Sequence, residues 1–135
     1  MIKRVNMHPS ARDTFVCTDI QASSIVDKVI FIAPVKCELV KAMAVYTTAA
    51  GQTCTGVLER LQGTETSGNG DNVVTGFDFE LAASTVQTGT IVNTGNINIF
   101  EAGNRLGLNA SGSSASLVNL IIMAQFRPVD DVPSA

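Results

Sequence analysis

The segment 116–128, SLVNLIIMAQFRP, carries apolar residues on both faces of a predicted strand. Successive side chains of a strand point to opposite faces, and a strand with one solvated face has a polar residue at every second position. One face of this strand would hold Val118, Leu120, Ile122, Ala124 and Phe126. The other face is also mostly apolar, with Leu117, Asn119, Ile121, Met123 and Gln125. We therefore expect both faces to be covered, one by a second sheet and the other by a neighbouring subunit.

Short β-favouring segments separated by glycine, proline and polar turns fill the rest of the chain. We expect strands over residues 13–19, 24–33, 35–48, 56–62, 73–81, 85–92, 96–100, 102–109 and 116–128. Strands with turn signals every ~8–12 residues are typical of an antiparallel two-sheet sandwich or a barrel. The sequence therefore predicts an all-β protein.

The segment 35–48 allows two interpretations. Val, Tyr and Thr favour a strand, and the blurred alternation over residues 40–44 suggests a bulge or a crossing between two sheets. The alternative is a helix over residues 37–46, because Leu39, Met43 and Tyr46 also follow helical spacing. We favour the strand.

The 135 residues are enough for one domain with a proper core. We expect an extended N-terminal arm over residues 1–12, a β domain over 13–129 and a C-terminal tail over 130–135. The arm holds Lys3, Arg4 and Arg12 without an acid, whereas the tail holds Asp130 and Asp131 without a base.

The overall charge and hydropathy narrow the possible partners. Charged residues make up 16% of the chain, against roughly 25% in a typical globular protein, and hydrophobic residues 45%. The net charge of −3 argues against a nucleic-acid partner. The longest aliphatic runs are far shorter than the roughly 20 residues of a membrane span, so we expect no membrane partner.

The cysteines indicate the compartment in which the chain folds. Cys17, Cys37 and Cys54 are odd in number, widely spaced and without a CxxC motif. This pattern is typical of buried, reduced thiols in a chain folded in a cytosol. No apolar stretch follows the N-terminal charges, so we expect no signal peptide.

No arrangement of residues in the sequence predicts catalysis. His8 is the only histidine, and no serine stands in a GxSxG motif. Neither a zinc site nor an EF-hand has its ligands. We interpret the acids at positions 59, 78, 80 and 101 as solvated charges and residues 63–72 as a solvent loop. We therefore expect no enzyme activity, no cofactor and no metal.

Two parts of the chain resemble a known group of proteins. They are IFIAPVKCELVKAMAV in residues 30–45, and FEAGNRLGL in residues 100–108 followed by a serine- and glycine-rich hairpin and a hydrophobic strand that closes in FRPV. This layout resembles small virion proteins of tailed bacteriophages, which include capsid decoration (cement) proteins and head-fibre or tail-fibre domains. The resemblance implies a jelly-roll-like β-sandwich, usually trimeric, on the capsid surface.

From this resemblance we expect a structural decoration protein whose partners are the major capsid protein and its own copies in a homotrimer. It would fold in the host cytoplasm and reside on the virion. We expect Lys3, Arg4 and Arg12 to bind the capsid. The oligomer interface would be formed by Leu117, Ile121 and Met123.

Two alternatives stay open. One is a fibre or spike domain that binds a host receptor through the loop 63–72 or the connection 110–116. The other is a cellular β-sandwich module that binds a small ligand.

Overall fold

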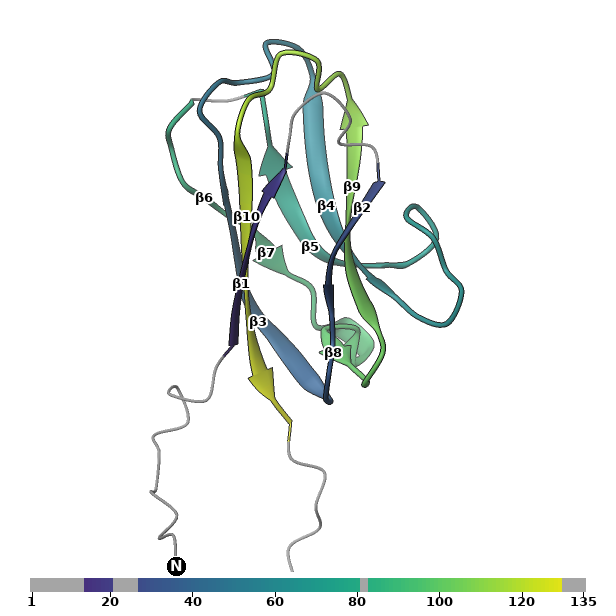
Figure 1. Cartoon of the computed structure of the whole chain (residues 1–135). Helices are drawn as coiled ribbons and strands as arrows, with labels where there is room; N and C mark the ends of the chain where they lie inside the picture. The colour runs from purple at the N-terminus through teal and green to yellow at the C-terminus, as the bar shows by residue number, and fades with distance from the viewer. Residues whose placement is uncertain (1–13, 21–26, 81–82, 130–135) are drawn as a thin grey trace, which may run out of the picture.

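The structure, a computed structural model, describes residues 14–20, 27–80 and 83–129, with the backbone alone for residues 14–20 and 27. Two antiparallel sheets pack face to face (Figure 1). The expected all-β sandwich is thus confirmed. The arm 1–12 and the tail 130–135 lie outside the described residues.

Sheet A contains the strands in the order β1-β10-β3-β6, with β8 also paired to β3. Their bounds are β1 Thr14–Ile20, β3 Cys37–Val45, β6 Gln87–Thr88, β8 Ile99–Phe100 and β10 Leu120–Pro128. Sheet B has the order β2-β9-β4-β5-β7. Its strands are β2 Asp27–Ile32, β4 Cys54–Leu61, β5 Asp71–Asp78, β7 Thr90–Ile91 and β9 Arg105–Gly112.

The strand pairing is nested along the chain. β1 pairs with β10, β2 with β9, β3 with β8, and β4 with β5. Successive pairs belong to alternate sheets, as if one long two-stranded ribbon were rolled around the core. This is the topology of a jelly roll.

The core between the sheets is made by alternate residues of each long strand. In β10 the buried positions are Leu120, Ile122, Ala124 and Phe126, as the sequence predicts. Phe126 stacks on Phe31 at 4.4 Å between ring centroids and meets Phe100 edge-on at 5.3 Å. Offset and edge-on ring pairs of this kind add stabilisation beyond their buried area.

The segment 35–48 forms the strand β3 over Cys37–Val45, so the alternative helix over residues 37–46 is wrong. Buried and outward positions alternate along β3, with one interruption. Gln125 of β10 lies opposite Lys41 and Phe126 opposite Leu39, which makes Val40 an extra residue in a bulge. The blurred alternation in the sequence therefore reflects a bulge and not a crossing between the sheets.

The single strand predicted over residues 85–92 is wrong, because the chain changes sheets within it. β6 pairs with β3 in sheet A, and β7 pairs with β5 in sheet B. Gly89 lies between them, and a Cβ atom there would collide with Val74 Cγ1 and lie 3.0 Å from Phe77 Cζ. The crossing thus requires a residue without a side chain. Likewise, the strand expected over 96–100 is shortened to β8 by a 3-10 helix at Thr94–Asn96.

We predict that Gly89→Ala destabilises the protein by about 1–3 kcal/mol, since the added methyl group overpacks the core between the two sheets. Urea unfolding of the variant and of Thr88→Ala, an exposed change on β6 next to Gly89, measures the difference. Equal free energies of unfolding for the two variants would contradict the close packing at Gly89.

Candidate functional site

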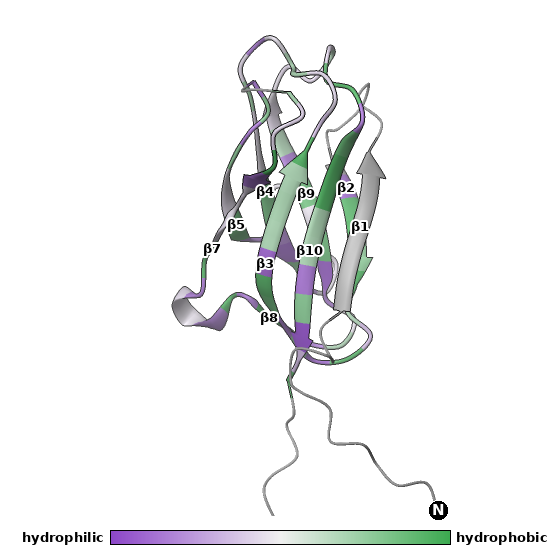
Figure 2. Ribbon diagram, turned by 90° about the vertical axis from the view of Figure 1, so that its left-hand side faces the viewer, coloured by the Kyte–Doolittle hydropathy of each residue, from purple (hydrophilic) through white to green (hydrophobic). Residues whose placement is uncertain are grey.

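An apolar patch lies on the outer face of sheet A. It consists of Met43, Val45, Val86, Ile121 and Met123, which line a shallow hollow of about 110 Å³ together with Ala44. Ile121 is 39% and Val86 59% exposed. We call these five residues the outer-face patch. Figure 2 shows β3 and β10 from this side, with hydrophobic colours over the half of each strand that holds the patch.

The other half of the same face is polar. Lys41 lies opposite Gln125 in register, and Glu38 opposite Arg127. Cross-strand neighbours of opposite charge stabilise a sheet that is open to solvent. The apolar character is therefore confined to one end of the face.

The structure corrects one residue of the predicted oligomer interface. Ile121 and Met123 lie on the outer face, but Leu117 is fully buried inside the subunit, so its assignment to the interface is wrong. Asn119 has a φ of +55°, which breaks the alternation before β10 begins. For the same reason Val118, expected inside, is exposed. The predicted capsid-binding residues Lys3, Arg4 and Arg12 lie outside the described residues.

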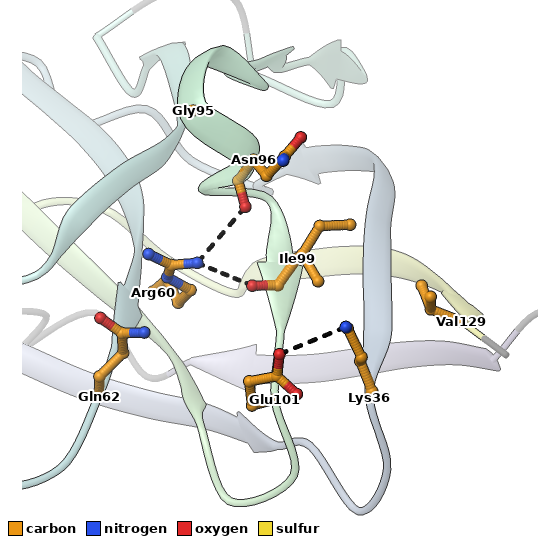
Figure 3. Close-up of a pocket in the computed structure, with 8 residues that line it drawn as sticks. All are labelled: Lys36, Arg60, Gln62, Gly95, Asn96, Ile99, Glu101 and Val129. Atoms are coloured by element: carbon orange, nitrogen blue, oxygen red, sulfur yellow. Dashed lines mark hydrogen bonds and ion pairs between the residues drawn. The ribbon is translucent and has the colours of Figure 1, made fainter. Parts of the chain in front are cut away.

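A polar pocket of about 440 Å³ lies at the end of the sandwich near Val129. Arg60 is one of the residues that line it (Figure 3). The guanidinium donates from Nη1 to the carbonyl oxygen of Ile99 at 2.8 Å and from Nη2 to Asp71 at 2.9 Å. Lys36 and Glu101 form an ion pair at 3.5 Å across the same pocket. The Arg60 contacts tie β8 to β4 and β5, whereas the ion pair joins Glu101, which follows β8, to Lys36, which precedes β3.

Glu59, expected to be a solvated charge, is instead buried. Its side chain is 1% exposed. The carboxylate accepts hydrogen bonds from the Gly68 backbone N–H at 2.8 Å and from Ser67 Oγ at 3.2 Å. Glu59 alternates with Leu58 of the core, so it belongs to the opposite face of sheet B, and the loop after β4 folds back over it.

Further contacts hold the same loop. Arg105 donates to the carbonyl oxygens of Gly63 and Glu65, both at 2.9 Å. The Gln62 N–H donates to the Glu65 carboxylate at 2.7 Å. The loop between β4 and β5, which extends from the sandwich at the right of Figure 1, is therefore fixed by side chains at its base. The signal in the sequence was an acid that alternates with Val57 and Leu61 on one side of a predicted strand.

The two described thiols are buried. Burial raises the pKa of the Cys37 thiol from its ordinary value of 9.0 to about 11. It also raises the pKa of Cys54, with a further contribution from Asp78. A thiol that stays protonated is a poor nucleophile and a poor metal ligand, which suits a purely structural role.

The described residues contain neither a metal-binding cluster nor a membrane-spanning helix. No group of three or more His, Cys, Asp or Glu side chains there lies close enough to hold a metal ion. No helix in the described part of the chain is long and apolar enough to cross a membrane.

We predict that Glu59→Gln destabilises the protein by about 1–3 kcal/mol, because the amide cannot accept the loop's hydrogen bonds as a carboxylate does and places a donor among donors. Protease cleavage within residues 62–70 should also become faster. Glu80→Gln, at an exposed position, is the matched control. Identical stability and cleavage rates in the two variants would show that Glu59 does not hold the loop.

We predict that the free energy of unfolding falls as pH rises from about 9 to 11, owing in part to Cys37. In this range the unfolded thiol loses its proton while the folded thiol keeps it, so the unfolded state binds fewer protons and gains stability. Cys37→Ala should show a smaller decline over the same range. Urea unfolding at pH 8, 9.5 and 10.5 compares the slopes, and parallel slopes would rule out this contribution.

Comparison with known proteins adds little to this geometry. No protein-family model matches the chain, and neither does any curated protein. A solved structure of infectious bursal disease virus, Gx strain, is similar over 98% of this chain and 38% of that chain, with 15% identity and a TM-score of 0.37. The chain thus spans well under half the length of that one.

Proposed function

We propose that this protein is a non-enzymatic structural component of a virion, and specifically a decoration (cement) protein on the capsid of a tailed bacteriophage. The observation that carries the proposal is the outer-face patch on a jelly-roll sandwich. A soluble protein exposes a contiguous apolar patch at a cost, and such a patch marks a surface that a partner covers. Viral capsid domains are one of the large groups that use this fold.

The composition supports the same proposal. Charged residues are scarce and hydrophobic residues abundant, as expected for a subunit whose surface is shared with neighbours in a symmetric assembly. The layout of residues 99–129 resembles that of small phage virion proteins. In this proposal the outer-face residues Ile121 and Met123 join copies in a homotrimer on the capsid surface. The major capsid protein is the second partner.

In this proposal the basic arm, residues 1–12, binds the major capsid protein by electrostatic attraction. Lys3, Arg4 and Arg12 lie within a stretch of twelve residues that contains no acid. An acidic capsid surface would attract such a segment, and added salt would weaken the attraction.

We predict that the triple variant Lys3→Ala, Arg4→Ala, Arg12→Ala binds capsids lacking this protein roughly tenfold more weakly, since each exposed ion pair contributes a fraction of a kcal/mol to about 1 kcal/mol. Co-sedimentation with capsids at two salt concentrations measures the binding. Lys28→Ala, an exposed cation of β2, is the control. Unchanged capsid occupancy by the triple variant would remove the arm from the binding surface.

One observation favours a second function, that of a fibre or spike domain. The loop 62–70 is held at its base by Glu59 and Arg105, so it could present a fixed surface to a receptor. The two functions differ in what the purified protein binds: a decoration protein binds empty capsids, whereas a spike domain binds host cells through this loop. Binding to cells that is lost on replacing residues 64–69 with glycine and serine would favour the spike.

A further inference from the structure

The loop 62–70 contains the only Asn-Gly pair of the chain, Asn69-Gly70. Asn69 is exposed, and its side-chain Nδ2 donates to Thr66 Oγ1 at 3.1 Å. The backbone N–H of Asn69 closes a turn by donating to the carbonyl oxygen of Thr66 at 3.0 Å. The pair therefore follows directly on a tight turn and is open to water.

The backbone N–H of Gly70 has no hydrogen-bond acceptor in the described part of the chain. Gly70 precedes Asp71, the first residue of β5, and the ladder between β4 and β5 begins only at the pair Arg60–Asp71. Most backbone N–H groups of a folded protein are paired within it. This one can lose its proton to solvent without first breaking a hydrogen bond, so its nitrogen is available as a nucleophile.

We propose that Asn69 and Gly70 form a site of spontaneous deamidation that alters the loop 62–70. The deprotonated nitrogen of Gly70 attacks Cγ of Asn69, a C–N bond closes a five-membered succinimide ring, and the side-chain nitrogen leaves as ammonia. Water then adds to one of the two ring carbonyls and breaks its bond to nitrogen, which leaves aspartate or isoaspartate at position 69. The steps need no oxidant, cofactor or second protein. This site is independent of the proposed function.

The residue that follows each asparagine distinguishes position 69 from other exposed positions. A side chain on that residue hinders attack by its nitrogen, and glycine has none. Asn93 and Asn96 are also exposed, but Thr94 and Ile97 follow them, and both of these side chains are branched at Cβ. Asn69 should therefore react faster than either.

The fold requires the glycine that makes the pair reactive. A Cβ atom at position 70 would lie 2.6 Å from the carbonyl oxygen of Arg60 and 2.7 Å from Leu61 Cδ2. Both neighbours belong to β4, which is held in the middle of sheet B by β9 and β5. Replacing Gly70 would thus disturb the start of the β4–β5 pairing, so the reactive pair is part of the hairpin itself.

The two products have different effects on the loop. Aspartate makes the net charge of −3 more negative by one unit and removes the donor that binds Thr66. Isoaspartate also inserts a methylene group into the backbone between positions 69 and 70. The chain is held on both sides of this point, because the Gly68 N–H donates to Glu59 at 2.8 Å and Gly70 packs on Arg60. The contact with Glu59 depends on a single side chain, so we expect the longer backbone to break it.

The test incubates the purified full chain for several weeks at neutral and at alkaline pH. Peptide mapping by tandem mass spectrometry locates the mass gain of about one dalton that marks the modification. Isoaspartyl methyltransferase with labelled S-adenosylmethionine measures isoaspartate separately. Asn69→Gln, whose longer side chain cannot close the five-membered ring, is the matched control. Limited proteolysis within residues 62–70 follows the loop, and circular dichroism verifies that every variant is folded.

We predict that position 69 is modified roughly ten times faster than positions 93 and 96, since glycine hinders the attack least. The rate should rise with pH, because the nitrogen of Gly70 must lose its proton. Aged protein that contains isoaspartate should be cleaved within the loop as readily as Glu59→Gln, since both lose the contact between Glu59 and Gly68. Asn69→Asp, which has the charge without the longer backbone, should resist cleavage as fresh wild-type protein does.

Two results would overturn the site: equal rates at positions 69, 93 and 96, or an unmodified Asn69 in the folded chain under conditions that modify it in urea. Aged protein that contains isoaspartate and is cleaved no faster than fresh protein would overturn the effect on the loop. Capsid binding is measured by co-sedimentation with fresh protein. The failure of this proposal is thus distinguishable from the failure of the proposed function.

Discussion

The antiparallel pairing of β10 with β3 is the interaction on which the rest of the structure depends. These two strands form the centre of sheet A, and their inner side chains supply much of the core. Phe126 of β10 joins Phe31 of sheet B and Phe100 of β8 in one group of rings. The pairing therefore fixes the position of three elements that are far apart in the sequence, and burial of these large side chains stabilises all of them together.

One face of this central pair packs in the core, so the residues of its other face are not constrained by core packing. The two ends of that outer face differ in polarity. Met43, Val45, Ile121 and Met123 are apolar at one end of the face, whereas Lys41 and Gln125 begin a polar region. A face that is half apolar and half polar resembles the core and rim of a protein interface more than an ordinary solvated sheet. This division is the physical basis for the proposal that the protein is a subunit of an assembly.

Away from the core, Glu59 and Arg60 fix two irregular segments of the chain. Glu59 holds the loop after β4 through its carboxylate, and Arg60 ties β8 to sheet B through its guanidinium. Neighbouring residues of one strand thus act on opposite faces of it. Hydrogen bonds to charged groups in a partly buried position are stronger than those between neutral groups, so these two side chains suffice to hold the loop after β4 and β8 in place.

The sequence by itself determined the fold class and the inner face of β10, because a period of two is a local property of an extended chain. It also located the bulge region in β3 through a local loss of alternation. Only the tertiary structure decided where the inward and outward alternation of side chains along a strand breaks down, and where an outward side chain is nevertheless buried. Asn119, with its positive φ, turns Leu117 into the core, and the close approach of Val74 and Phe77 makes Gly89 the crossing point between the sheets. Glu59 is buried by a loop that returns from outside its strand. Each of these three features depends on contacts between segments that are distant in sequence. Such contacts produce no periodic pattern of apolar residues from which they could be predicted.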